Sequence, residues 1–152
     1  MPQDYNTQFS RLQDLSTGTV AGVISTNTIP MTQPRDYGMG KKIYGEVRVV
    51  TPSVDGAGYS LDIDVVAMDA TNTTVNTVLA QAVATIPGNS AAGYRATFLL
   101  PTKLAVAGDG NLALRYVARG TGALTAMTVN SGLTLEPGYN HADPRTDSGV
   151  IG

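Results

Sequence analysis

Short segments of alternating apolar and polar residues, separated by turns, recur along most of the chain, and they constrain its fold more than any other feature. In "YSLDIDVVAM" (59–68) every odd-numbered position is apolar. Side chains of a β-strand point alternately to opposite faces, so this segment predicts a strand with one face on a core and the other in water. Further strands are predicted at 43–51, 76–89, 94–100, 111–119 and 124–136, with a short apolar segment at 17–26.

The spacing of these segments predicts the fold class. Roughly seven or eight short strands, with a turn about every eight to twelve residues, indicate an all-β fold in the form of a two-sheet antiparallel jelly-roll sandwich. The segment 76–89 is ambiguous, because its alanines and leucine suit a helix while its β-branched residues favour a strand. We predict a strand there.

The chain is long enough for one domain, at 152 residues, and short for two. We predict an N-terminal arm over residues 1–15, the sandwich over 16–136 and an extended C-terminal tail over 137–152. Neither end has a periodic apolar pattern. A loop from Thr26 to Lys42, broken by prolines and glycines, precedes the strand at 43–51.

Composition argues against several classes of function. A net charge of -2, with 14% charged residues, provides no basic face for nucleic acid, so no nucleic-acid partner is expected. The chain has no cysteine, which removes disulfides, thiolate nucleophiles and the usual structural zinc sites. No long apolar run and no signal-like N-terminus occur, so we expect no membrane partner and no secretion by that route.

Asp62 and Asp64 are the most conspicuous acidic pair. On a strand their Cα atoms stand about 7 Å apart, and an inverting glycosidase separates its two carboxyl groups by roughly 6.5 to 9.5 Å. A catalytic acid needs a raised pKa, which requires desolvation. We therefore expect both side chains on the solvated face, with no metal between them, and expect their joint replacement to change stability by well under about 2 kcal/mol. A glycosidase stays as a minor alternative.

The opposite face of that strand is predicted to carry the core. The strand at 111–119 shows the same division, with Arg115 and Arg119 facing outward. The positions predicted to be buried are Leu61, Ile63, Val65, Leu112, Leu114 and Tyr116.

No catalytic, metal or cofactor site is predicted. The single histidine, His141, has Asp143 and Asp147 nearby, but a metal site needs ligands held on a rigid frame, which the predicted tail does not supply. Glycine pairs at 56–58 and 108–110 are predicted as turns without a following helix, so phosphate binding is not supported either.

The predicted partner-binding residues lie on the two arms and on the long loop. Apolar residues in polar surroundings could become buried against a neighbour, and a long polar loop in a small domain is often functional. These residues are Tyr5, Phe9 and Leu12 in the N-terminal arm, Arg35, Asp36, Lys41 and Lys42 in the loop, and Tyr139, His141, Arg145 and Ile151 in the tail. Deleting residues 1–14 or 138–152 is expected to leave the melting temperature of the isolated protein nearly unchanged.

Three stretches, "PRDYGMGKKIYGEVRVVT", "YSLDIDVVAMD" and "LLPTKLAVAGDGNLALRYVARGTGALTAMTVNSGLTLE", resemble the jelly-roll capsid cement (decoration) proteins of tailed bacteriophages. The likeness lies in the Arg-Asp-x-Gly-x-Gly approach to a strand, the Leu-Pro pair before a loop, the hairpin near residues 111–127 and the order of strands. It runs from about Pro34 to Glu136 and does not extend into the tail.

The resemblance implies a non-enzymatic protein without cofactors. Such a protein is made in the host cytoplasm and binds the major capsid protein on the outer capsid surface of the virion. It acts as a homo-oligomer, a dimer or trimer, that stabilises the shell. The alternative is a jelly-roll carbohydrate-binding module of a phage tail or of a secreted protein. Carbohydrate sites usually expose tryptophan and tyrosine, and this chain has no tryptophan and 6% aromatic residues.

Overall fold

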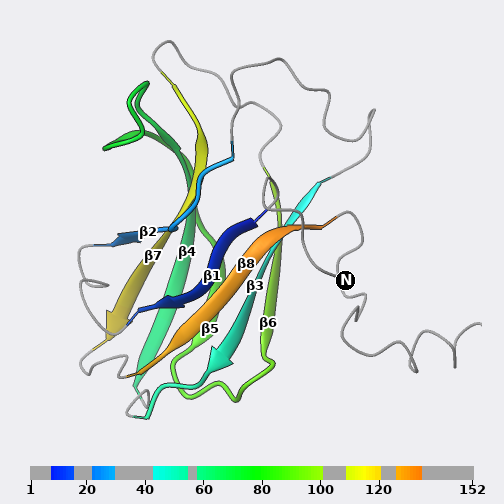
Figure 1. Ribbon diagram of the computed structural model, residues 1–152. Helices are drawn as coiled ribbons and strands as arrows, with labels where there is room; N and C mark the ends of the chain where they lie inside the picture. The colour runs from blue at the N-terminus through cyan, green and yellow to red at the C-terminus, as the bar shows by residue number, and fades with distance from the viewer. Residues whose placement is uncertain are drawn as a thin grey trace, which may run out of the picture.

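The computed structural model describes residues 8–15, 22–29, 43–54, 58–100, 109–120 and 126–134. The regular elements in these ranges are β-strands arranged in two sheets (Figure 1). The strands are β1 (Gln8–Asp14), β2 (Val23–Ile24), β3 (Tyr44–Thr51), β4 (Tyr59–Met68), β5 (Val75–Pro87), β6 (Arg95–Leu99), β7 (Leu112–Gly120) and β8 (Thr128–Thr134). No helix in this part of the chain is long and apolar enough to cross a membrane.

The two sheets have four strands each, and all neighbouring strands pair antiparallel. Sheet A has the order β1-β8-β3-β6, and sheet B has the order β2-β7-β4-β5. Apart from the β4–β5 hairpin, each step along the sequence of strands passes from one sheet to the other. The prediction of an all-β, two-sheet antiparallel sandwich is therefore confirmed, including the strand predicted at 76–89, which is β5.

The core lies between the sheets, where the inner faces of both bury apolar side chains. Sheet A contributes residues such as Val47 and Val49, and sheet B contributes Ile63, Leu114 and Tyr116, all fully buried. The residues predicted to be buried on the strands at 59–68 and 111–119 are all in this core. The period-2 pattern succeeded here because each strand has one face against the opposite sheet.

The alternation does not hold for the second half of β4. Val66 and Met68 were predicted on the solvated face, but both are buried, together with Ala113 of β7, in a second apolar cluster. Ile24 of β2 and Val75 of β5 pack against this cluster. The outer face of sheet B is therefore apolar near the β4–β5 hairpin, where residues of the flanking strands pack against it.

The prediction of an N-terminal arm over residues 1–15 is wrong for residues 8–15. Residues 8–14 form β1, an edge strand of sheet A that pairs with β8, and both Phe9 and Leu15 are fully buried. Deleting residues 1–14 would remove β1 and part of the core, so we now expect that deletion to lower the melting temperature strongly. Residues 1–7 and the predicted tail at 137–152 lie outside the described residues.

Candidate functional site

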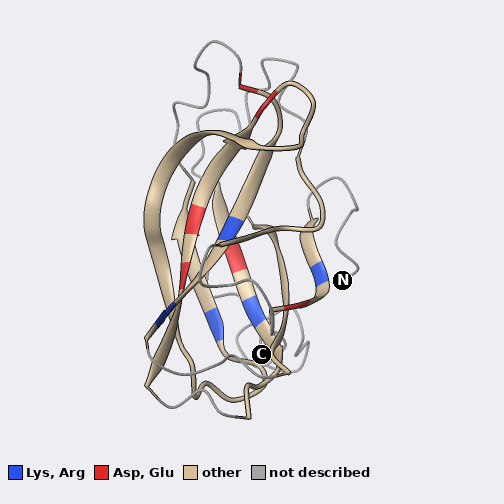
Figure 2. Ribbon diagram, turned by 90° about the vertical axis from the view of Figure 1, so that its left-hand side faces the viewer, with Lys and Arg blue, Asp and Glu red and all other residues tan. Residues whose placement is uncertain are grey.

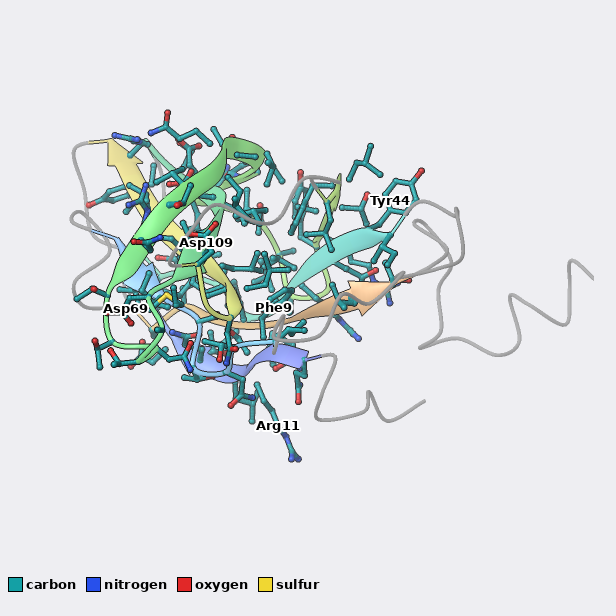
Figure 3. All side chains as sticks on the ribbon, turned by 90° about the horizontal axis from the view of Figure 1, so that it is seen from above. Phe9, Arg11, Tyr44, Asp69 and Asp109 are labelled. Carbon is teal, nitrogen blue, oxygen red and sulfur yellow. The ribbon has the colours of Figure 1, made fainter. Side chains whose placement is uncertain are left out.

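The two predicted contact residues within the described ranges have different surroundings. Phe9 points into the core (Figure 3) and is not available to a partner. Leu12 is 57% exposed at the edge of sheet A, where the backbone has a positive φ of 49° and its N–H donates to Asn130 Oδ1 at 2.6 Å. Leu12 can therefore contact a partner, whereas Phe9 cannot.

The other predicted contact residues lie outside the described residues. They are Tyr5, Arg35, Asp36, Lys41, Lys42, Tyr139, His141, Arg145 and Ile151. The loop predicted from Thr26 to Lys42 is described only in its first residues, of which Ile29 is buried and forms a β-bridge with Leu112.

Asp62 lies on the outer face of sheet B and forms an ion pair with Arg119 of the neighbouring strand β7. Its Oδ2 accepts a hydrogen bond from Arg119 Nε at 3.2 Å, and its Oδ1 accepts one from the Thr85 hydroxyl at 2.9 Å. The Arg119 side chain is largely exposed. The Asp62 side chain itself is only 16% exposed, so the predicted solvated position is confirmed only in part.

Asp64 was also predicted on the solvated face, but it is only 1% exposed. Its Oδ2 accepts two hydrogen bonds from Arg115, from Nε at 3.0 Å and from Nη2 at 2.7 Å, and its Oδ1 accepts the main-chain N–H of Ala82 at 2.8 Å. Gly22, the residue before β2, leaves room for the aliphatic part of Arg115, because a Cβ there would stand 2.9 Å from Arg115 Cδ. The prediction that Asp64 lies on the solvated face is therefore wrong, because contacts from β5 and β7 enclose it. The expectation that replacing Asp62 and Asp64 together changes stability by well under about 2 kcal/mol no longer holds for the same reason.

The four charged residues form two Asp–Arg pairs along β4 and β7, and Figure 2 shows the acidic and basic positions on these adjacent strands. Asp64 lies directly opposite Arg115 in the register of these strands. Each carboxylate already has a guanidinium partner and a second donor. The arrangement gives no support to a glycosidase that would use Asp62 and Asp64 as acid and base.

Asp69 organises the β4–β5 hairpin. It accepts main-chain N–H groups of Thr71 and Thr73 and the hydroxyls of Thr71, Thr73 and Thr74. The main-chain N–H of Thr73, followed by the hydroxyl of Thr74, holds the pKa of Asp69 well below its usual value. With its oxygens engaged in this way, Asp69 has a structural role in the turn.

Asp109 links the same hairpin to the segment before β7. Its Oδ1 accepts hydrogen bonds from Asn76 Nδ2 and from the Thr77 hydroxyl, both at 2.7 Å. In Figure 3 Asp69 and Asp109 lie on the same side of the view, well away from Tyr44. The described residues contain no group of three or more His, Cys, Asp or Glu side chains that could hold a metal ion.

A buried polar cluster joins the two sheets around Tyr116. The Tyr116 hydroxyl is hydrogen-bonded to Ser10 Oγ at 2.8 Å and to Ser131 Oγ at 2.6 Å. Ser10 Oγ also donates to Gln13 Oε1, and Gln13 Nε2 donates to the carbonyl oxygen of Ile24 at 2.8 Å. The cluster thus ties the edge strand β1 to β8 in its own sheet and to β2 and β7 in the other.

Burial raises the pKa of Tyr116 to about 12, and this has a measurable consequence. An unfolded tyrosine loses its proton near pH 10, so above that pH the unfolded state binds fewer protons than the folded state. The stability due to this group is complete below about pH 10 and is lost as the pH rises towards 12. We expect wild type to lose roughly 2 kcal/mol more than Tyr116→Phe between about pH 9 and pH 11.5 in urea unfolding. A constant difference between the two proteins would contradict this assignment.

The outer face of sheet A is the described surface that sequence reasoning overlooked. On it, Glu46 and Arg95 form an ion pair at 3.9 Å, and Tyr44 lies directly opposite Leu99, which is 46% exposed. Alternation in "YRATFLL" places Arg95, Thr97 and Leu99 on one side of a strand. This alternation could have identified the outward side of the strand, but it could not have shown that the strand lies at the edge of a sheet.

Comparisons with known proteins do not add a family. No protein-family model matches this chain, and no curated protein matches it either.

Proposed function

We propose that this protein is a structural capsid cement, or decoration, protein of a tailed bacteriophage. In this proposal it binds assembled major capsid subunits on the outer surface of the shell as a homo-oligomer, after synthesis in the host cytoplasm, and it stabilises the shell without catalysis. The family resemblance between Pro34 and Glu136 motivates the proposal.

The strand order is the observation that carries it. The described strands form two antiparallel four-stranded sheets with the orders β1-β8-β3-β6 and β2-β7-β4-β5, and a jelly roll is likewise a double sheet of eight strands. The fold implied by the resemblance is thus compatible with the pairing of the strands. Fold alone does not determine function, so the capsid role needs a direct test.

The use of the acidic side chains also supports a structural role. Asp62, Asp64, Asp69 and Asp109 are all engaged in hydrogen bonds or ion pairs that hold strands and turns together. A rigid body of this kind suits a protein that binds capsid subunits and stabilises the shell. An oligomer that engages several capsid subunits at once gains effective affinity from multivalency, even if each contact is weak.

The decisive experiment is co-sedimentation with assembled shells. Purified protein is mixed with shells of the phage that encodes it, stripped of this protein, and with shells of an unrelated phage. We expect saturable binding to the cognate shells only, together with a higher melting temperature of the shells. If the protein does not pellet with cognate shells and instead binds polysaccharide on a glycan array, the carbohydrate-binding alternative replaces the proposal.

A variant lacking residues 138–152 tests the predicted role of the tail. We expect its shell occupancy to fall while its own melting temperature stays close to that of wild type. The variant Leu12→Asp tests whether the β1 edge of the sandwich contacts the shell. Leu12 is exposed at this sheet edge, so its replacement should not affect the core. If both variants bind at wild-type occupancy, neither the tail nor the β1 edge carries the contact.

A further inference from the structure

A row of hydrogen-bond donors crosses the outer face of sheet A from one edge strand to the other. Arg48 of β3 lies directly opposite Arg95 of β6 on one side and Asn130 of β8 on the other. Arg11 of β1 continues the row beyond Asn130, because the following residue, Leu12, donates its main-chain N–H to Asn130 Oδ1. Arg11 is exposed, and Figure 3 shows it projecting away from the body of the protein. We call Arg11, Asn130, Arg48 and Arg95 the donor row.

The donor row lies on the outer face because the adjacent residues of its strands point into the core. Val49, which follows Arg48, is fully buried. Ala96, which follows Arg95, is also buried. Opposite residues of antiparallel strands have Cα atoms about 4.5 to 5.5 Å apart, so a row across four strands is about 15 Å long. An extended peptide of about five residues has the same length.

Arg48, at the centre of the donor row, faces a like charge. Val49 N–H donates to the Tyr94 carbonyl, so Arg48 and Arg95 form a non-hydrogen-bonded pair, in which opposite side chains are closest. Like charges directly opposite each other destabilise a sheet. Arg95 is paired with Glu46 at 3.9 Å and has a further interaction, whereas no carboxylate of the described residues forms an ion pair with Arg48. A positive charge without a counter-charge in this part of the chain therefore remains on this face.

Acidic residues border the donor row on both sides. Glu46 lies two residues before Arg48 in β3. Asp14 lies opposite Thr128, which is two residues before Asn130 in β8. At about 3.3 Å per residue, the Cα atoms of these bordering positions are about 7 Å from the row. Glu46 and Asp14 both have interactions within the protein. An anionic ligand wider than one extended chain would therefore lie against carboxylates, which limits the row to a narrow ligand.

We propose that the donor row binds an extended acidic segment of the major capsid subunit, which lies across the strands of sheet A. The inference rests on the proposed function for the source of this segment. A guanidinium donates two parallel hydrogen bonds to a carboxylate, and a carboxylate between Arg48 and Arg95 would remove their mutual repulsion. Side chains on one face of an extended peptide recur about every 7 Å. Acidic residues at alternate positions of the segment would thus reach successive donors of the row.

The bordering acids favour a peptide over a nucleic acid. Phosphates of a duplex lie on both sides of grooves about 6 to 12 Å wide, and they would lie against Glu46 and Asp14. The net charge of -2 also opposes binding to a polyanion that carries many charges. Exposed ion pairs are individually weak, but a shell presents many copies of the same segment, so an oligomer sums their contributions.

Arg48→Glu tests the donor row in the co-sedimentation assay with cognate shells. We expect the affinity of wild type to fall as the NaCl concentration rises, and that of Arg48→Glu to be lower by roughly tenfold or more at low salt. The melting temperature of the variant should equal or exceed that of wild type, because glutamate opposite Arg95 replaces a like-charge pair by an opposite one.

Arg119→Glu is the matched control for this experiment. It makes the same change of charge on the outer face of sheet B, where the Arg119 side chain is 58% exposed. We expect its affinity for shells to stay within about twofold of wild type. Equal losses in the two variants would mean that net charge rather than the donor row determines binding, and salt-independent binding of wild type would also overturn the proposal.

A titration of the full chain without shells separates this inference from the proposed function. If wild type does not bind shells, the proposed function fails, and the titration still tests the donor row. The probe is a soluble peptide of alternating glutamate and serine, added to isotope-labelled protein and followed by NMR. We expect changes in the amide signals of Arg11, Arg48 and Asn130, and none of these changes in Arg48→Glu. Unchanged signals at about 5 mM peptide would overturn the proposal, as would tighter binding of a single-stranded DNA oligonucleotide at the same residues.

Discussion

Replacing Asp64 by alanine should lower the free energy of unfolding by about 2 to 4 kcal/mol, measured by urea denaturation. The substitution leaves the Arg115 guanidinium and the Ala82 N–H without their buried acceptor. Breaking a buried ion pair costs more than the pair contributes, because the remaining charge stays desolvated. Arg115 is partly exposed, which allows some rehydration and limits the loss.

The neighbouring pair provides a matched control. Asp62 and Arg119 lie on the same two strands, but the Arg119 side chain is 58% exposed, so Asp62→Ala should cost about 0 to 1 kcal/mol. A double-mutant cycle with Asp64→Ala and Arg115→Ala should yield a coupling energy larger than that of the Asp62–Arg119 cycle. If the two aspartates had equal effects, the burial of Asp64 would not be the cause.

Ile63→Ala should also destabilise the protein strongly, by about 2 to 5 kcal/mol. Ile63 is fully buried on the inner face of β4, and alanine loses its transfer free energy and leaves a cavity between the sheets. Thermal and urea unfolding would both report this change.

Val54→Ala is the corresponding control at the surface. Val54 is 75% exposed, so its truncation should change stability by no more than about 0.5 kcal/mol. A small loss for Ile63→Ala would mean that its side chain is not enclosed by both sheets.

Much of the strand content followed from local sequence. The period-2 pattern identified β4 and β7 and the inward positions of Ile63 and Tyr116, because a strand with one face on a core must alternate. The same argument failed for residues 8–14, which have few apolar residues and were assigned to an arm. Their strand is held by pairing with β8, which is distant in the sequence, and by two polar contacts. Ser10 is hydrogen-bonded to Tyr116 in the core, and Gln13 donates to the carbonyl oxygen of Ile24.

The candidate sites were less predictable than the strands. Alternation assigned Asp62 and Asp64 to the same face, which is correct, but their environments differ because Arg115 and Ala82 enclose only Asp64. The exposed position of Leu99 was not predicted from the sequence, since a single exposed leucine near the end of a strand is ordinary.

The sequence by itself therefore determined the class of fold, the position of most strands and the inward face of the central ones, since these depend on the residues of each strand alone. Only the tertiary structure decided that Asp64 is buried, that β1 belongs to the sandwich and that β6 is the last strand of sheet A among the described strands. Those properties depend on which strands become neighbours. Contacts of that kind join residues that are distant in the sequence, such as Asp64 and Arg115, which are 51 positions apart, and no local pattern records them.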